Sequence, residues 1–412
     1  MKKKLLLYSA AVLMLILNSI GSGFQINEHG AKSMAMAGAF TGLANDATAV
    51  HFNPAGIVNL KGTNISAGVS LISPSSSFRG PAPEITEYEL ESQLFTPFNF
   101  YLTHEINEDL AIGLSVNNPY GLGTEWPDDW VGKNLAVYTE IRTFFFNPVV
   151  AYRLTDELSV SAGATFAYGD VEIIRYTPLY PFAGEAKVSL EGDGTSWGFN
   201  AAVLYQPMET LSFGLSFRSE TTFDFQGGAE SEGPSQLERS LPAGNISAEL
   251  TTPMNITFGI ALMATEELTI TSDFQYVGWS SYDELAVDFE DPNQTDLASL
   301  RDYNNSFIAR LGGEYALTDY FDLRGGVFYD KNPIDDERVD PTLPDADRIG
   351  LNIGFGYDIS DAFTIDVAYL FLRFNEREIT NSKENYGIGD TPFNGVYNST
   401  AHLFGINFSY NF

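Results

Sequence analysis

Apolar and polar residues alternate one by one along most of this chain. The last nine residues, FGINFSYNF, place Phe404, Phe408 and Phe412 on one face and Gly405 and Asn407 on the other. Because successive side chains of a β-strand point to opposite faces, this pattern predicts a strand with one aromatic face and one small, polar face. The chain is therefore expected to be all-β.

Fourteen segments of this kind can be counted, and they begin near residues 63, 96, 110, 144, 158, 195, 211, 253, 268, 304, 321, 347, 363 and 401. Very short turns join them in pairs, around Asn107, Asp156, Met208, Glu266, Thr318 and Asp361. Long connections separate the pairs. Strict alternation of short turns and long loops is typical of an outer-membrane barrel. Residues 61–412 are therefore predicted to form a 14-stranded antiparallel transmembrane β-barrel.

The polar faces of these segments are rich in Gly, Ser, Thr and Asn. A soluble β-sandwich would turn its polar faces to bulk water, where more Lys and Glu are expected. Within a membrane, only closure of the sheet satisfies the backbone hydrogen bonds of every strand. The composition of the polar faces therefore favours a barrel over a soluble sandwich.

Residues 1–23 have the parts of a secretory signal peptide. Lysines at positions 2 to 4 precede an apolar run from Leu5 to Leu17, and small residues follow at positions 21 to 23. The apolar run is shorter than the ~20 residues of a spanning helix, so we expect cleavage, just before Phe24, rather than a retained anchor. Export and a membrane barrel together predict a location in the outer membrane of a Gram-negative bacterium.

Residues 24–60 belong to none of the predicted strands. They are dense in Ala and Gly, and they contain the turn signature Asn53-Pro54-Ala55-Gly56. Proline fixes its own φ, and glycine tolerates unusual dihedral angles. A disordered leader is the alternative, but the low charge and the Met, Phe and Val content favour burial. We therefore predict a small N-terminal hatch, residues 24–60, that plugs the barrel lumen.

The composition excludes several functions. The formal net charge is −32, and a nucleic-acid partner would need clustered Lys and Arg. There are no cysteines, so thiol nucleophiles and Cys metal sites are excluded. The acidic connections show no EF-hand spacing and are interpreted as a solvated surface. His29, His51, His104 and His402 show no metal spacing, and no two are predicted to share a site. No metal and no cofactor is expected.

Gly194-Thr195-Ser196-Trp197-Gly198 matches the G-x-S-x-G pattern of lipases and esterases. That motif functions only at a strand-to-helix turn, whereas here it opens a predicted barrel strand. An outer-membrane lipase is therefore the weaker alternative, and no catalytic residue is assigned.

Three stretches resemble the outer-membrane long-chain fatty acid transporters and their relatives that import aromatic hydrocarbons. They are GFQINEHGAKSMAMAGAFTGLANDATAVHFNPAG at the mature N-terminus, NNPYGLGTEW from Asn117, and LRGGVFYDKNPIDDERVDPTLPDADRIGLNIGFGY from Leu323. The resemblance implies a 14-stranded barrel that is closed by an N-terminal hatch containing the motif Asn53, Pro54 and Ala55. It also implies import of a hydrophobic ligand with lateral release into the membrane.

In the family, as the resemblance implies, ligand first meets a groove on extracellular loops and leaves through a gap made by a kink in the third strand. Candidate kink residues here are Gly113 and the stretch Asn117, Asn118 and Pro119. Candidate groove residues, which could instead pack on each other, are Trp126, Trp130, Val131, Leu135 and Val137.

A carboxylate head group would need a buried basic residue. Five arginines fall on predicted polar faces, and hence in the lumen: Arg153, Arg218, Arg310, Arg324 and Arg348. The head-group candidates are Arg310, Arg324 and Arg348. Arg348 matches the family motif, with an ion pair to Asp345 or Asp347 as the alternative interpretation.

The sequence therefore predicts a transporter of hydrophobic molecules, with long-chain fatty acids ahead of aromatic hydrocarbons. A general porin is less favoured, because a simple pore needs no plug. The expected partners are the hydrophobic ligand, outer-membrane lipid and lipopolysaccharide, and the barrel assembly machinery through the C-terminal strand that ends at Phe412.

Overall fold

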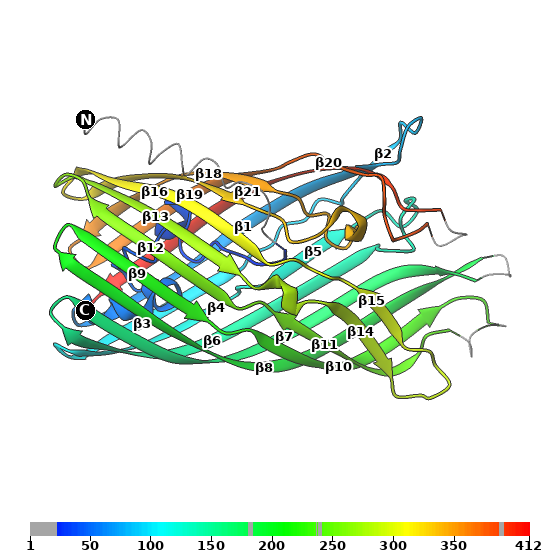
Figure 1. The fold of residues 1–412 in the computed structure, drawn as a ribbon, viewed down its shortest axis with the longest axis horizontal. Coiled ribbons are helices and arrows are strands. Elements are labelled where there is room, and N and C mark those ends of the chain that lie inside the picture. The colour runs from blue at the N-terminus through cyan, green and yellow to red at the C-terminus, as the bar shows by residue number, and fades with distance from the viewer. Residues whose placement is uncertain (1–22, 180–183, 236, 238–240, 387–390) are drawn as a thin grey trace, which may run out of the picture.

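Long antiparallel strands form a closed barrel in the computed structural model (Figure 1). The structure describes residues 23–179, 184–235, 237, 241–386 and 391–412. Residues 1–22 of the predicted signal peptide lie outside this part of the chain. Among the described helices, none is long and apolar enough to cross a membrane.

Fourteen strands follow one another around the wall, and the last pairs with the first through a register that runs from Asn64↔Asn411 to Arg79↔Val396. The predicted number of strands and all six short turns are confirmed. The wall consists of β1 (Thr63–Arg79), β3 (Phe98–Asn107), β4 (Leu110–Asn117), β6 (Tyr138–Thr155), β7 (Leu158–Pro178), β8 (Glu185–Met208), β9 (Leu211–Arg218), β12 (Asn255–Met263), β13 (Leu268–Val277), β16 (Ser306–Thr318), β17 (Phe321–Asp330), β18 (Arg348–Ser360), β19 (Phe363–Phe374) and β21 (Gly395–Asn411).

Additional strands in the long connections extend this sheet beyond the wall. β10 pairs with the first part of β8, β11 with β10, β14 with β11, and β15 with β14. The sequence pattern did not predict them. They are β2 (Glu87–Glu89), β5 (Gly121–Glu125), β10 (Thr221–Glu232), β11 (Gly244–Thr252), β14 (Glu284–Phe289), β15 (Leu297–Leu300) and β20 (Arg377–Ile379), accompanied by the 3-10 helices η3 (Trp279–Ser281) and η4 (Asp336–Arg338).

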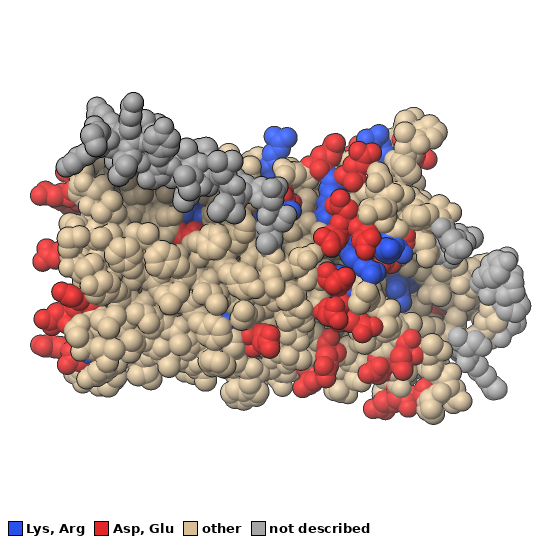
Figure 2. Space-filling view, in the orientation of Figure 1, with Lys and Arg blue, Asp and Glu red and all other residues tan. Residues whose placement is uncertain are grey.

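The outer face of the wall is apolar and the inner face is small and polar. In β18, Leu351 and Ile353 are 55% and 62% exposed, whereas Asn352 between them is 8% exposed. Charged residues gather toward the two ends of the barrel, and few lie on the broad band between (Figure 2). Apolar residues outside and polar residues inside are the arrangement that a transmembrane barrel requires.

The hatch, residues 24–60, lies inside the barrel (Figure 1). It contains α2 (Ala31–Ala35), α3 (Ala49–Phe52) and η1 (Pro54–Asn59). Its backbone bonds side chains from strands around the wall: Ala31 N donates to Asn407 Oδ1 (2.9 Å), Asn352 Nδ2 to Met34 O (2.6 Å), Ser212 Oγ to Gly42 O (2.6 Å) and Ser159 Oγ to Ala55 O (2.9 Å). The hatch is therefore held from several sides.

Glycines on the inner faces allow this close approach. A Cβ atom on Gly214 would lie 2.0 Å from the Thr41 carbonyl oxygen, and one on Gly312 would lie 2.4 Å from the Met36 carbonyl oxygen. Any larger residue at these positions would push the hatch off the wall. The small residues that alternate along the strands are therefore the surface on which the hatch packs.

Candidate ligand-binding site

Asn53 ties the hatch to itself and to the wall. Its side chain is fully buried. Nδ2 donates to Thr41 O (2.9 Å) and to Val203 O of β8 (3.0 Å), while Oδ1 accepts from Ala55 N (3.1 Å). Pro54 begins η1, where its missing N–H is not needed. The Asn-Pro-Ala motif therefore fixes both a turn and a contact with the barrel.

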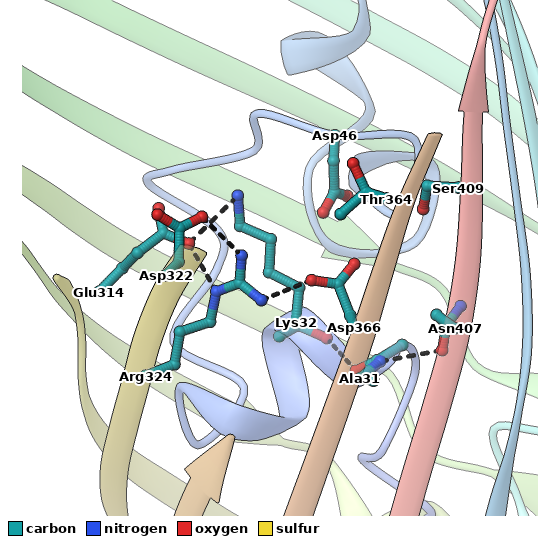
Figure 3. A network of polar contacts seen from close by, with 12 residues as sticks. Ala31, Lys32, Asp46, Glu314, Asp322, Arg324, Thr364, Asp366, Asn407 and Ser409 are labelled. Carbon is teal, nitrogen blue, oxygen red and sulfur yellow. Dashed lines mark hydrogen bonds and ion pairs between the residues drawn. The ribbon is translucent and has the colours of Figure 1, made fainter. Parts of the chain in front are cut away.

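Arg324 stands at the centre of an ion cluster where α2 meets the wall (Figure 3). Its guanidinium lies 2.6 Å from Glu314, 2.5 Å from Asp366 and 3.2 Å from Asp322, and Lys32 of the hatch lies 3.4 Å from the same Glu314. Three carboxylates surround Arg324 and already neutralise its charge. This pairing argues against Arg324 as a head-group residue.

Arg348 is also paired, but not with the expected acids. Its Nε and a terminal nitrogen contact Asp330 Oδ2 at 3.0 and 2.9 Å, and its guanidinium lies over the Phe374 ring. The alternative interpretation named Asp345 or Asp347 because they are adjacent in sequence. The partner is instead Asp330 on β17, which the antiparallel register places directly opposite Arg348.

Arg310 keeps the potential to bind an anion. It is 6% exposed, and its terminal nitrogen donates to Asn27 Oδ1 of the hatch (3.0 Å). Among the described residues, no carboxylate lies within 4.0 Å of its guanidinium. Of the three head-group candidates, only Arg310 is free of an ion pair in this part of the chain.

Two histidines that were predicted to be independent lie together. The ring centroids of His29 and His51 are 3.9 Å apart, so the expectation that no two share a site is wrong. Asn117 Nδ2 of β4 contacts His51 Nδ1 at 2.9 Å and His29 Nδ1 at 3.3 Å. Burial lowers the pKa of His29 to about 3, so both hatch rings are neutral at ordinary pH.

An apolar pocket of about 810 Å³ lies in the lumen next to the N-terminal end of the hatch. Its lining includes Phe24, Leu122, Ile141, Leu250, Val287 and Tyr303. Arg301 stands in its wall and forms an ion pair with Asp340. Within the described structure, the Arg301 Nε is buried without a hydrogen-bond partner. Sequence reasoning missed Arg301, because it lies in a connection where no periodicity marks a face.

The wall is interrupted beside this pocket. β4 ends at Asn117 and β5 begins at Gly121. The hatch lines the break through an isolated β-bridge between Gln25 and Tyr120. Ile26 N donates to Pro119 O (2.9 Å) and Gly121 N donates to Phe24 O (3.0 Å). Gly113 instead pairs regularly with Thr103 and Val149, so the prediction of a kink at Gly113 is wrong.

A second space, the wall cavity, adjoins this break and occupies about 1460 Å³. It shares Phe24, Leu122 and Ile141 with the apolar pocket. Its lining also includes Leu94 and Phe98, which are 62% and 40% exposed. The wall cavity therefore touches both lumen residues and exposed residues of the outer surface.

The tryptophans of the predicted outer groove are buried. Trp126 and Trp130 are each 1% exposed and stack with ring centroids 4.2 Å apart. Their N–H groups donate to Pro341 O (2.9 Å) and Ala136 O (2.8 Å). Val137 is buried and Leu135 packs against the same cluster, whereas Val131 is exposed. Except at Val131, these residues form the core of the extracellular loops rather than an open groove.

Asp345 meets the first described residue of the chain. Gly23 N donates to its Oδ2 at 2.9 Å. Asp345 lies in the connection between β17 and β18, and burial raises the pKa of its carboxyl to about 6. Asp345 therefore lies next to the predicted cleavage point, directly before Phe24.

Neither metal nor hydrolase geometry is visible in the described residues. They contain no group of three or more His, Asp or Glu side chains arranged to hold a metal ion. Ser196 and its flanking glycines lie inside β8, which runs from Glu185 to Met208 without a strand-to-helix turn. The site is an apolar pocket, a plugged lumen and an interrupted wall.

A closed barrel with an apolar outer face and a small, polar inner face defines an outer-membrane β-barrel protein. The family model described as "Outer membrane protein transport protein (OMPP1/FadL/TodX)" matches residues 13–412, and the chain belongs to this family. An outer-membrane location follows from this membership.

Relatives of similar length share about a quarter of their residues with this chain. The long-chain fatty acid transport protein of Salmonella typhi is 25% identical, over 98% of this chain and 97% of its own. That of Escherichia coli K12 is 24% identical over the same shares. Outer membrane protein P1 of Haemophilus influenzae is 26% identical over 77% of this chain and 75% of its own.

Solved structures show the same fold. A FadL homologue of Pseudomonas aeruginosa superposes with a TM-score of 0.85 at 21% identity, over 95% of this chain and 100% of the other. The toluene transporter TodX of Pseudomonas putida gives 0.76 at 17% identity, over 96% and 99%. At such identities the likeness concerns the fold alone.

Proposed function

We propose that this protein imports a hydrophobic molecule, a long-chain fatty acid, which binds in the apolar pocket and leaves through the wall cavity into the membrane. The observation that carries this is the position of Phe24, which lines both spaces. The relatives named as long-chain fatty acid transport proteins support the choice of ligand.

The pocket suits an alkyl chain. Each methylene moved from water into an apolar site contributes ~0.8 kcal/mol, so affinity should rise with chain length until the pocket is filled. The buried Arg301 Nε is a donor that a carboxylate could accept from. No catalytic step is required, because the ligand leaves as it entered.

The hatch acts as the gate in this proposal. Phe24, Gln25 and Ile26 occupy the edge of the interrupted strand, with Gln25 paired to Tyr120. When this segment moves, the apolar pocket and the wall cavity become one passage at residues 118–120. Asn118 and Pro119, two of the predicted kink residues, lie at this point.

Aromatic hydrocarbons are the second candidate. Phe24, Phe225, Tyr282 and Tyr303 give the apolar pocket several ring faces, against which an aromatic ligand can pack edge to face. The fold likeness to a toluene transporter is compatible with this choice.

One substitution pair tests the proposal. Ala248 of β11 lines the apolar pocket, whereas its neighbour Glu249 is exposed on the opposite face of the strand. Ala248→Trp should fill the pocket and reduce binding of oleate by about tenfold or more, as steric loss of a few methylenes predicts. Glu249→Trp is the matched control and should bind oleate normally. Equal binding by both variants would contradict the proposed pocket, and binding of toluene without oleate would favour the second candidate.

Two further partners follow from the same proposal. The acidic residues of the extracellular loops (Figure 2) would lie beside lipopolysaccharide. Phe412 is 73% exposed at the end of the closing strand β21, as a recognition signal for the barrel assembly machinery would be.

A further inference from the structure

A separate polar cavity of about 560 Å³ lies between the hatch and the wall. Its lining includes Arg218 of β9, Arg310 of β16, Asp273 of β13 and the hatch residues His29 and His51. Gln25 and Tyr120 line both this cavity and the wall cavity, so the two spaces are neighbours. Neither the barrel ladder nor the proposed ligand pocket uses this group of side chains.

The charges of the polar cavity do not balance. Its lining contains two positively charged arginines and one carboxylate. Its two histidines are neutral and add no charge. Among the described residues, no carboxylate lies within 4.0 Å of either Arg218 or Arg310. A buried cation without a partner is costly, so the lining is complementary to an anion.

Asp273 does not supply that partner, although the β13–β16 register places it opposite Arg310. Its Oδ2 accepts from two hatch amides, Phe40 N (3.1 Å) and Thr41 N (2.9 Å). Glu28 of the hatch accepts from Asn27 N (3.0 Å) and lines the wall cavity instead. Asp330, the third acid whose charge acts on Arg310, is paired with Arg348. The acids near Arg310 therefore bond the hatch backbone or another arginine, and in the described structure Asp273 Oδ1 is left without a hydrogen-bond partner.

Arg218 is held in place with spare donors. One terminal nitrogen donates to His51 O (2.9 Å) and lies 3.4 Å from His51 Nδ1. Guanidinium carries five N–H donors in a planar fork, which matches the two oxygens of a carboxylate. The hatch thus positions Arg218 without neutralising it.

We propose that the polar cavity is a binding site for a carboxylate or a similarly small monovalent anion, received by Arg218 and Arg310. Only the origin of the anion rests on the proposed function: it is either a free anion or the head group of a fatty acid that has passed the Phe24 segment. In the second case, the polar cavity is a second binding site that the fatty acid reaches after the apolar pocket.

Bromide is a direct probe of this site. Crystals of the full mature protein soaked in sodium bromide should show an anomalous peak beside Arg218 and Arg310. The peak should vanish in Arg218→Gln and persist in Arg218→Lys, which keeps the charge. Arg153→Gln is the matched control, because Arg153 also bonds the hatch backbone, at Val58 O (3.1 Å), but lies outside the cavity. Absence of the peak from the wild-type cavity, or its survival in Arg218→Gln, would overturn the proposal.

Competition then distinguishes the two origins of the anion. Loss of the bromide peak in acetate but not in oleate identifies a free anion, and loss in oleate identifies the head group. The proposed function is tested separately through Ala248→Trp and neutral oleyl alcohol, whose binding does not involve Arg218. Failure of both oleyl alcohol and oleate to bind would remove the transport proposal while leaving the bromide result intact.

Discussion

Replacement of Asn53 by Ala should loosen the hatch and leave the barrel intact. The side chain makes three hydrogen bonds from a fully buried position, to Thr41 O, Val203 O and Ala55 N. Each lost bond of this kind costs about 1 kcal/mol, so the substitution should cost about 3 kcal/mol. None of the three belongs to the strand ladder, so the loss falls on the hatch.

That free energy corresponds to an increase of about 150-fold in the population of the open hatch. Hydrogen exchange, read by mass spectrometry on peptides that cover residues 40–60, measures it directly, because local opening sets the exchange rate. Peptides from β17 and β18 should exchange as in the wild type, and the unboiled variant should migrate in SDS gels as the unboiled wild type does.

Asn53→Ser separates the contribution of the cap on Ala55 N from that of the bond to the barrel wall. A serine can still cap Ala55 N, but it is too short to reach Val203 O on the wall, so its effect should be smaller than that of Asn53→Ala. If the peptides of Asn53→Ala exchange at the wild-type rate, the motif does not hold the hatch and the reasoning is refuted.

Three more perturbations follow from the structure. Arg324→Gln leaves Glu314, Asp322 and Asp366 of the wall without their shared cation and should destabilise the protein by about 3 to 5 kcal/mol in thermal unfolding. Lys32→Met should cost less, since Glu314 keeps Arg324. Because burial raises the pKa of Asp345 to about 6, above its unfolded value, its contribution to local stability falls as pH rises from about 4 to 6. Asp345→Asn should remove this pH dependence from exchange at the hatch amides of Gln25 and Ile26, after correction for intrinsic rates, and an unchanged profile would exclude Asp345 as its source. Trp126→Ala should lower the stability of the folded extracellular loops by about 3 to 5 kcal/mol, because it leaves a cavity in their core. Near-UV circular dichroism should show the loss of packing, while the affinity for oleate stays within a few-fold of wild type. A large loss of oleate affinity would show instead that Trp126 takes part in ligand binding.

The wall could be predicted from sequence because each barrel strand alternates between lipid and lumen, so residues such as Leu351 and Asn352 report their faces locally. The loop strands could not be predicted in this way. β10 and β14 pair outside the membrane, where no lipid requires an apolar face. Pairings that depend on the hatch path were also out of reach. His29 and His51 are separated by 22 positions, and only the fold of residues 24–60 brings them to Asn117.

The partners of the arginines could not be predicted from sequence either. Their polar faces placed them in the lumen, but the register, not the neighbouring sequence, gives Arg348 its partner Asp330. Trp126 and Trp130 were predicted to line a binding groove because they are aromatic. In the structure they stack on each other and are buried. Sequence alternation therefore defines faces, whereas partners require the register.

The seam between β1 and β21 sets an order of events during biogenesis. The hatch precedes the first strand in the chain, yet Ala31 N is bonded to Asn407 on the last. The seam cannot close until the final residues have crossed the inner membrane, and once closed it surrounds a segment that is bonded from several sides. We therefore expect the hatch to wait as an unpaired chain in the periplasm and to fold in the same step that seals the barrel, so that newly made protein would not pass through an open, leaking intermediate.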